Sequence, residues 1–270
     1  MNENNKQNLS IDNLDDRFQR TSMLIGEKKF QELQDLHVTI IGLGAVGFHA
    51  AEAITRMGVK NLRIVDFDII RESNINRQLL ALTSTLGMSK VQTARQRLMD
   101  INPYLKLEVF ESFFHEEEFE KIFAIPTHIV IDAIDSFTPK VCLLTLLKEK
   151  DIPVISSMGA AGRTDPVQIK IGDLFESTGC ALASRIRKEL RKNGITSGIR
   201  CVYSTETRRK PQDMTEKEEK EYYSRGRTRK SLGSISFITG IFGYMIASEV
   251  FQFALNRNNI ENKLHLNQGE

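Results

Sequence analysis

The hexapeptide GLGAVG at residues 42–47 has the Gly-x-Gly-x-x-Gly spacing of a loop that binds phosphate or ribose. It follows the β-branched run HVTII at 37–41 and precedes a run of good helix formers. In that setting Gly42 permits a tight turn, Gly44 lets a ligand approach the backbone, and Gly47 allows the helix to pack closely on the sheet. Backbone amides at the start of the helix then face an anion, so the loop is a candidate nucleotide site.

Carboxylates follow the ends of two other predicted strands. Asp66 ends the run NLRIVD, where a carboxylate can accept hydrogen bonds from ribose hydroxyls, and Asp68 lies two residues further on. Asp132 follows the apolar run HIVI, and Asp135 lies in the turn before the next predicted helix. An aspartate in that turn is often only a helix cap. At the same sheet edge as the glycine loop, it can also hold a magnesium ion against phosphates.

Two cations and several amides lie between these carboxylates. Arg77 belongs to the run SNINRQ at 73–78, and Lys90 belongs to the run GMSK at 87–90. Such residues are usually solvated surface charges. A nicotinamide pocket gains nothing from them, whereas a triphosphate does, because arginine forms a bidentate fork with two oxygens and lysine offsets the charge of a departing pyrophosphate. The cations therefore favour a nucleoside triphosphate over an oxidoreductase cofactor.

The elements that must position these residues alternate between strand and helix over the first 160 residues. Strands are predicted at 37–41, 61–67, 106–110, 128–134 and 153–157, with helices at 48–57, 90–102, 115–123 and 139–150. This alternation predicts an α/β fold of the Rossmann-like, doubly wound kind, with a mostly parallel sheet covered by helices on both faces. A C-terminal extension with strands at 167–171 and 199–204 is expected to complete the sheet.

The chain is expected to form one domain preceded by a tail. The predicted units are a mobile, Asn-rich tail at 1–16 and a single domain at 17–270, made of a nucleotide-binding core at 17–160 and a substrate-side extension at 161–270. Within the extension, the charged segment 207–231 predicts a mobile basic loop, and the apolar segment 232–255 predicts a buried helix. The fifteen mostly apolar residues 232–246 are too few to span a membrane, so no stable membrane span is expected.

Composition excludes several classes of protein. The 270 residues are 40% hydrophobic and 27% charged, which excludes disorder over the whole chain, and 17 Gly and 6 Pro exclude a collagen-like repeat. Three Cys favour a reducing compartment, and the first residues lack a secretory signal, so a cytoplasmic location is expected. Residues 185–230 carry a charge of +8 and the rest of the chain −6, against a formal net charge of +2. The basic segment can therefore meet an anion.

The ordered motifs GLGAVG, DFD, SNINRQ, GMSK and DAIDS resemble the nucleotide-activating core of the ubiquitin-activating enzyme superfamily, whose bacterial members adenylate carboxylates. RFQR at 17–20 matches the entry helix of that superfamily, so the resemblance covers about residues 17–205. Within the superfamily the chain is most similar to the tRNA threonylcarbamoyladenosine dehydratases, through the stretches RFQRTSMLIGEK, AIDSFTPK, GAAGRTDPVQIKIGDL and RCVYSTE. Those enzymes use ATP to dehydrate the threonylcarbamoyl group on adenosine 37 of tRNAs and close it into a ring.

The resemblance implies ATP and Mg²⁺ as cofactors and gives the candidate residues their roles. It assigns Asp66 to the ribose, Arg77 and Lys90 to the phosphates, and Asp135 to magnesium. It also implies a homodimer in which Arg20 acts in trans on the phosphates bound by the neighbouring subunit. The residues expected to line the nucleotide site are Gly42, Gly44, Ala45, Gly47, Asp66, Asp68, Asn74, Arg77, Gln78, Lys90, Asp135 and Ser136.

Cys201 matches a cysteine of the dehydratase branch and fits two roles. It could be a nucleophile that forms a transient thioester, activated by a cation such as Arg200, or it could be a packing residue in an apolar strand. The paired C-x-x-C motifs of zinc-bearing, sulfur-carrier-activating relatives are absent, and three scattered Cys cannot supply a tetrahedral site. Zinc is therefore not expected, and the dehydratase branch is favoured.

Three functions remain open on the sequence. The first is the ATP-dependent tRNA dehydratase, with an acyl-adenylate intermediate, tRNA as substrate and a possible sulfur-transfer protein as partner. The second is adenylation of the C-terminal glycine of a small sulfur-carrier protein. The third is a nucleotide-binding scaffold without turnover. The nucleotide motifs cannot separate the first two, but the basic segment favours tRNA, because neutralising phosphates is the sequence-independent part of nucleic-acid affinity.

Overall fold

A computed structural model describes residues 16–209 and 232–266, with the side chains of the last helix described as far as residue 257. The predicted tail at 1–16 lies outside these residues except for Asp16. The predicted basic loop at 207–231 also lies outside them except for residues 207–209.

The seven strands of the described residues form one sheet in the order β3-β2-β1-β4-β5-β7-β6. They are β1 (His37–Ile41), β2 (Asn61–Val65), β3 (Lys106–Phe110), β4 (Ile129–Asp132), β5 (Val154–Ser157), β6 (Ile169–Asp173) and β7 (Arg200–Ser204). All neighbours pair in parallel except β6 and β7, which are antiparallel. The predicted doubly wound α/β fold is therefore confirmed, and its sheet is completed by two strands of the C-terminal extension.

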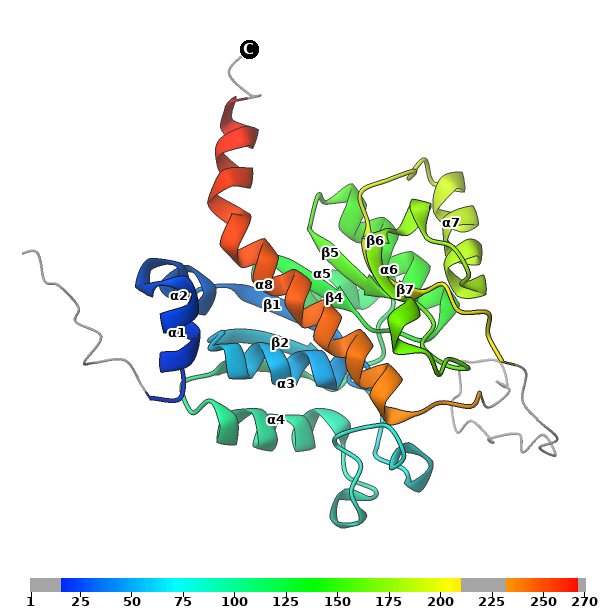
Figure 1. Ribbon diagram of the computed structural model, residues 1–270, viewed down its shortest axis with the longest axis horizontal. Coiled ribbons are helices and arrows are strands. Elements are labelled where there is room, and N and C mark those ends of the chain that lie inside the picture. The colour runs from blue at the N-terminus through cyan, green and yellow to red at the C-terminus, as the bar shows by residue number, and fades with distance from the viewer. Residues whose placement is uncertain (1–15, 210–231, 267–270) are drawn as a thin grey trace, which may run out of the picture.

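Helices cover both faces of the sheet (Figure 1). They are α1 (Gln19–Ile25), α2 (Glu27–Gln34), α3 (Gly47–Met57), α4 (Lys90–Ile101), α5 (Phe119–Ile122), α6 (Phe137–Glu149), α7 (Ala181–Lys192) and α8 (Ser236–Leu266). One buried cluster joins the sheet to α3, α4 and α8, and a second joins it to α5, α6 and α7. The helix expected at 115–123 is instead a 3₁₀ turn, Glu116–Glu118, followed by the single turn of α5.

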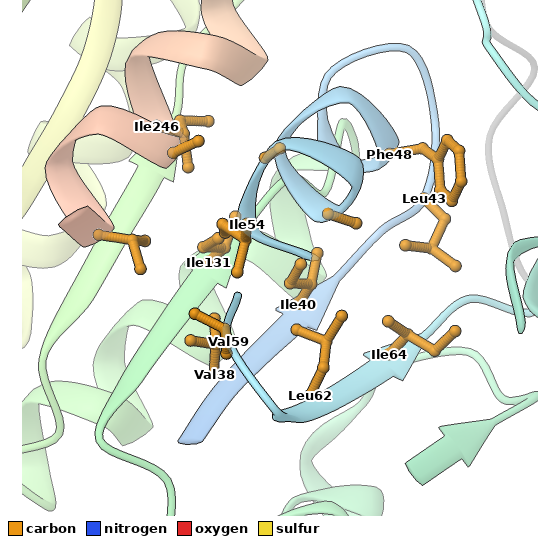
Figure 2. Close-up of a cluster of buried hydrophobic side chains, with 14 of the residues drawn as sticks. Val38, Ile40, Leu43, Phe48, Ile54, Val59, Leu62, Ile64, Ile131 and Ile246 are labelled. Carbon is orange, nitrogen blue, oxygen red and sulfur yellow. The ribbon is translucent and has the colours of Figure 1, made fainter. Parts of the chain in front are cut away.

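The first cluster holds the glycine-loop helix between the sheet and α8. Figure 2 shows apolar side chains of β1, β2 and β4, among them Val38, Ile40, Leu62, Ile64 and Ile131, facing Ile54 of α3 and Ile246 of α8. Gly243 of α8 lies so near α3 that an added Cβ would be 2.5 Å from the Cβ of His49 and 2.7 Å from the carbonyl oxygen of Val46. The absence of a side chain at Gly243 thus lets the two helices approach closely.

The apolar helix is longer than the sequence predicts. Residues Ser236–Arg257 of α8 form a 22-residue stretch that is long and apolar enough to cross a membrane by length and composition. Half of an 18-residue apolar window within it is buried inside the structure, against α3 and the sheet. The expectation that residues 232–246 are too few for a span is therefore wrong on length, because the apolar stretch continues to Arg257. Its buried contacts are nevertheless those of a core helix.

Candidate nucleotide site

The glycine loop connects β1 to α3 at the carboxyl edge of the sheet. Gly42 has φ of 97°, in the left-handed region, and a Cβ there would lie 2.8 Å from the carbonyl oxygen of Ala133. Its amide donates to the carbonyl of Val65 (2.8 Å). A Cβ at Gly44 would meet no atom of the described part of the chain within 4 Å, so the space beside that backbone is open there. The loop is thus fixed on its inner side by β2 and by the segment after β4, and is accessible on its outer side.

Asp66 links the glycine loop to the end of β2. Its carboxylate is 8% exposed and accepts a hydrogen bond from the Leu43 amide on Oδ2 (2.6 Å) and from the Asp68 amide on Oδ1 (2.9 Å). A carboxylate offers about four lone-pair sites, so each oxygen retains capacity for another donor. The position predicted for ribose recognition therefore has both the acceptors and the fixed orientation that such a contact needs.

Lys90 and Asp68 form an ion pair that the sequence does not predict. The Lys90 Nζ lies 2.7 Å from Asp68 Oδ2, and Arg71 Nη1 lies 2.6 Å from Asp68 Oδ1. Lys90 is 5% exposed, and its amide also donates to the Asp68 carbonyl (3.0 Å). Two cations thus share one carboxylate, which leaves a net positive charge beside Asp66. These cations are held in fixed positions and could interact favourably with a phosphate bound nearby.

The remaining polar residues lie on the turn that follows this ion pair. Asn74 is buried and accepts the Arg71 amide on Oδ1 (3.1 Å). Gln78 is also buried, and its Oε1 has no hydrogen-bond partner among the residues that the structure describes. The half-buried Arg77 turns back on its own segment, donating from Nη1 to the Ser73 carbonyl (2.7 Å) and to Asn76 Oδ1 (2.9 Å). A phosphate-binding role for Arg77 therefore requires that it exchange these neutral acceptors for phosphate oxygens.

The segment after β4 completes the edge. Asp135 is exposed, and the Ser136 hydroxyl lies 3.4 Å from its Oδ1. Asp132, by contrast, is fully buried and contacts Lys140 and Ser156, two residues that the sequence analysis misses. A signal for Lys140 does exist, because it shares the buried stripe of α6 with Leu144 and Leu147.

Arg20 lies apart from this cluster on the exposed surface of α1, a helix that packs against α2 (Figure 1). The fold therefore leaves it accessible to a second molecule, which is what a role in trans requires.

Cys201 is buried in β7 and poorly suited to nucleophilic attack. Its residue is 0% exposed, and burial, together with the charge of Asp173, raises the pKa of its thiol to about 12. Arg200, the cation expected to activate it, instead pairs with Glu249 at 2.7 Å. Because the thiolate is the reactive form, this environment favours the packing role of Cys201.

Comparison with known proteins identifies the family. The ThiF family profile matches residues 18–269. This chain belongs to the ThiF family. It is 39% identical over 191 residues to tRNA threonylcarbamoyladenosine dehydratase of Bacillus subtilis. That match covers 71% of this chain and 75% of the Bacillus protein. It is 32% identical over 247 residues to the Escherichia coli enzyme of the same name. That match covers 87% of this chain and 92% of the E. coli enzyme.

A solved structure extends the similarity of this ThiF family chain to its fold. The crystal structure of E. coli tRNA N6-threonylcarbamoyladenosine dehydratase in complex with AMP superposes with a TM-score of 0.81 at 30% identity. The match covers 90% of this chain and 95% of that one. The same E. coli protein has also been solved in complex with ATP, with a TM-score of 0.80. The resemblance inferred from the ordered motifs is therefore confirmed at the level of family and fold.

Proposed function

We propose that this protein is an ATP-dependent tRNA threonylcarbamoyladenosine dehydratase that acts in the cytoplasm on adenosine 37 of tRNA. The observation that carries the proposal is that the carboxyl edge of the sheet combines an open glycine loop, the oriented Asp66 carboxylate and held cations. This edge belongs to a chain that matches dehydratases over most of its length. Residues 17–270 act as one unit in this proposal.

The residues present fit ATP. Asp66 accepts the ribose hydroxyls, while Lys90 and Arg77 contact the phosphates, with Ala45 and Gly44 beneath them. Asn74 and Gln78 would line the same site, and the Gln78 Oε1, which has no partner among the described residues, is an acceptor available to a ligand donor. The chemistry is then adenylation: the substrate carboxylate attacks the α-phosphorus, and pyrophosphate departs.

Cyclisation follows from the same activation. A carboxylate is a poor electrophile because oxide would have to leave, whereas an acyl adenylate releases AMP. A nitrogen of the threonylcarbamoyl group attacks the activated carbonyl, loses its proton and expels AMP, which carries away one of the original carboxylate oxygens. The substrate thereby loses one water overall. The attack is intramolecular, so proximity accelerates it.

Magnesium fits the donors at the end of β4. The Asp135 carboxylate and the adjacent Ser136 hydroxyl supply oxygen ligands, which Mg²⁺ prefers, and Mg²⁺ commonly combines one or two carboxylates with substrate phosphates. When bound, the ion would offset charge on the phosphates. Asp135 would hold it, and Lys90 would contribute the second positive charge at this edge.

The substrate and a second subunit account for features outside the nucleotide edge. Four exposed cations lie on α7: Arg185, Lys188, Arg191 and Lys192. They belong to the basic segment predicted from the sequence and offer contacts to tRNA phosphates. Arg20, exposed on α1, would reach the nucleotide of a partner subunit in a homodimer.

A sulfur-carrier adenylyltransferase is the second candidate. Molybdopterin-synthase adenylyltransferase of E. coli is 32% identical over 135 residues, but that match covers only 50% of this chain. The E. coli dehydratase matches 87% of this chain, which favours the dehydratase as the first candidate.

The proposal is tested by incubating the protein with ATP, Mg²⁺ and tRNA that carries threonylcarbamoyladenosine, followed by mass spectrometry of the nucleosides. We expect the modified nucleoside to lose the mass of one water in the presence of ATP, and the loss to disappear in Arg77→Ala. If the nucleoside is unchanged while a carrier protein's C-terminus becomes adenylated, the second candidate holds. If neither substrate consumes ATP, the protein is a nucleotide-binding scaffold.

A further inference from the structure

Lys140 is a charged side chain in the interior of the protein. It lies in the first turn of α6 and is 0% exposed, as is Asp132 at the end of β4. The Lys140 Nζ lies 2.7 Å from Asp132 Oδ2. Removing both charges from water is costly, and apolar residues of similar volume are often equally or more stabilising in such places. Stability alone therefore does not account for this pair.

The hydrogen bonds of the pair converge on a single residue, Ile134. Asp132 Oδ1 accepts the Ile134 amide (3.1 Å), and Lys140 Nζ donates to the Ile134 carbonyl (2.9 Å). Ser156 of β5 donates to Asp132 Oδ2 (2.6 Å) and so holds the carboxylate from the neighbouring strand. Both polar backbone groups of Ile134 are thus held by buried side chains, and the next residue in the chain is Asp135.

The same segment touches the glycine loop. The Ala133 amide donates to the Ile41 carbonyl (2.9 Å), and the Ala133 carbonyl oxygen lies where a Cβ on Gly42 would come within 2.8 Å of it. Residues 133 and 134 therefore connect Asp135 to the loop that approaches the phosphates. A shift of this segment would change the distance between the two.

We propose that Lys140, with Asp132 and Ser156, forms a positioning network that fixes Asp135, and any magnesium ion it binds, relative to the glycine loop. The network touches no ligand itself and acts through the Ile134 peptide groups. The inference rests on the proposed role of Asp135 in Mg²⁺-ATP binding but not on the identity of the nucleic-acid substrate.

The test measures ATP binding by titration calorimetry, with saturating Mg²⁺ and with EDTA, and takes the ratio of the two affinities. The test variant is Asp132→Asn with Lys140→Met, which removes both charges together and so avoids a single buried, unpaired charge. We expect its affinity in EDTA to match the wild type, while the gain from Mg²⁺ falls about 10-fold or more, as for other outer residues that orient metal ligands. Lys140→Arg, which keeps a cation, should restore part of the gain.

Two controls separate positioning from stability. Arg63→Met removes another buried cation, which donates to the Ile125 carbonyl rather than to Ile134, and it should leave the Mg²⁺ gain unchanged. In an Asp135→Asn background, adding the Asp132→Asn and Lys140→Met changes should lower the gain no further, because residues that act through one group are not additive.

The inference is overturned if the double variant melts near the wild-type temperature and keeps the full Mg²⁺ gain, or if its effect adds to that of Asp135→Asn. The inference is also overturned if the wild-type protein binds ATP with the same affinity in Mg²⁺ and in EDTA. Intact Mg²⁺-dependent ATP binding without dehydration of the modified tRNA would instead remove only the proposed substrate.

Discussion

The segments before and after β4 are held by buried cations in similar ways. After β4, Lys140 donates to the Ile134 carbonyl and pairs with the fully buried Asp132. Before β4, Arg63 donates to the Ile125 carbonyl (3.0 Å) and pairs with Glu108, which is 40% exposed. Only the segment after β4 lies at the carboxyl edge, where open α/β sheets bind ligands. One kind of contact thus holds the segment of the proposed site at one end of β4 and an ordinary connection at the other end.

The greatest loss of activity is expected from a change at Asp135, which lies in the segment after β4. Asp135→Asn should lower the rate of tRNA dehydration by about 10²–10³-fold, since it removes one preorganised charge beside the reacting phosphates. Because Asp135 is exposed, its free energy of unfolding should change by less than about 0.5 kcal/mol. Single-turnover kinetics and urea denaturation measure the two. The control is Glu149→Gln, an exposed carboxylate at the other end of α6, which should retain full activity.

The second prediction concerns stability on the two sides of β4. Lys140→Met alone should lower the free energy of unfolding by about 3–5 kcal/mol, because Asp132 would remain buried without its cation. Arg63→Met should cost less, about 1–2 kcal/mol, since Glu108 can turn to solvent while the Ile125 carbonyl loses one hydrogen bond. Urea denaturation of both variants tests this order. A larger loss in Arg63→Met would mean that burial of the partner carboxylate does not set the difference.

The third prediction is that Cys201 of β7, unlike Asp135 after β4, takes no part in the reaction. Cys201→Ala should reduce dehydration activity by less than about 3-fold, because the buried thiol with its pKa of about 12 holds almost no thiolate at neutral pH. It should lower the free energy of unfolding by about 1 kcal/mol through lost packing. An activity loss as large as that of Asp135→Asn would restore the nucleophile hypothesis.

The smallest effect concerns an uncharged donor to the glycine loop. His49 Nδ1 lies 2.7 Å from the Ala45 carbonyl oxygen, and burial lowers the pKa of His49 below 6.5, outweighing that contact and the charge of Glu52. The unfolded chain therefore binds the proton first, and stability falls as pH drops below about 6.5. His49→Gln should make the free energy of unfolding less dependent on pH between about 7.5 and 5.5. An unchanged slope in denaturation at these pH values would exclude His49 as the cause.

The sequence predicts the conformation of the glycine loop and the position of Asp66 because their signals are local. Glycine spacing, a carboxylate at a strand end and alternating elements depend on neighbours in the chain, and the loop at 42–47 and Asp66 lie where this pattern places them. The order of motifs also indicates the family, which no single motif does. The antiparallel pairing of β6 with β7 is a tertiary feature that these signals do not specify.

The sequence does not predict how charges pair. The sequence predicts a phosphate contact for Lys90 but not its pairing with Asp68, which depends on how the chain turns after β2. The sequence does not single out Lys140 because a lone lysine is usually exposed, and its partner Asp132 lies on a strand that precedes α6 and is itself held by Ser156 of another strand. The direction of Arg77 is likewise set by carbonyls of its own turn. Such contacts depend on three-dimensional geometry rather than on residue type and spacing.

The position of β1 next to β4, which brings Gly42 beside Ala133, affects the order in which the protein can fold. In the sheet β1 lies between β2 and β4, yet β2, α4 and β3 all come before β4 in the chain. While the polypeptide is being synthesised, β1 therefore has one open edge until β4 emerges, and open strand edges are sites of aggregation. A fragment that ends before residue 129 should thus be prone to self-association. The glycine loop at 42–47 can make its contact with Ala133 only when β4 docks beside β1.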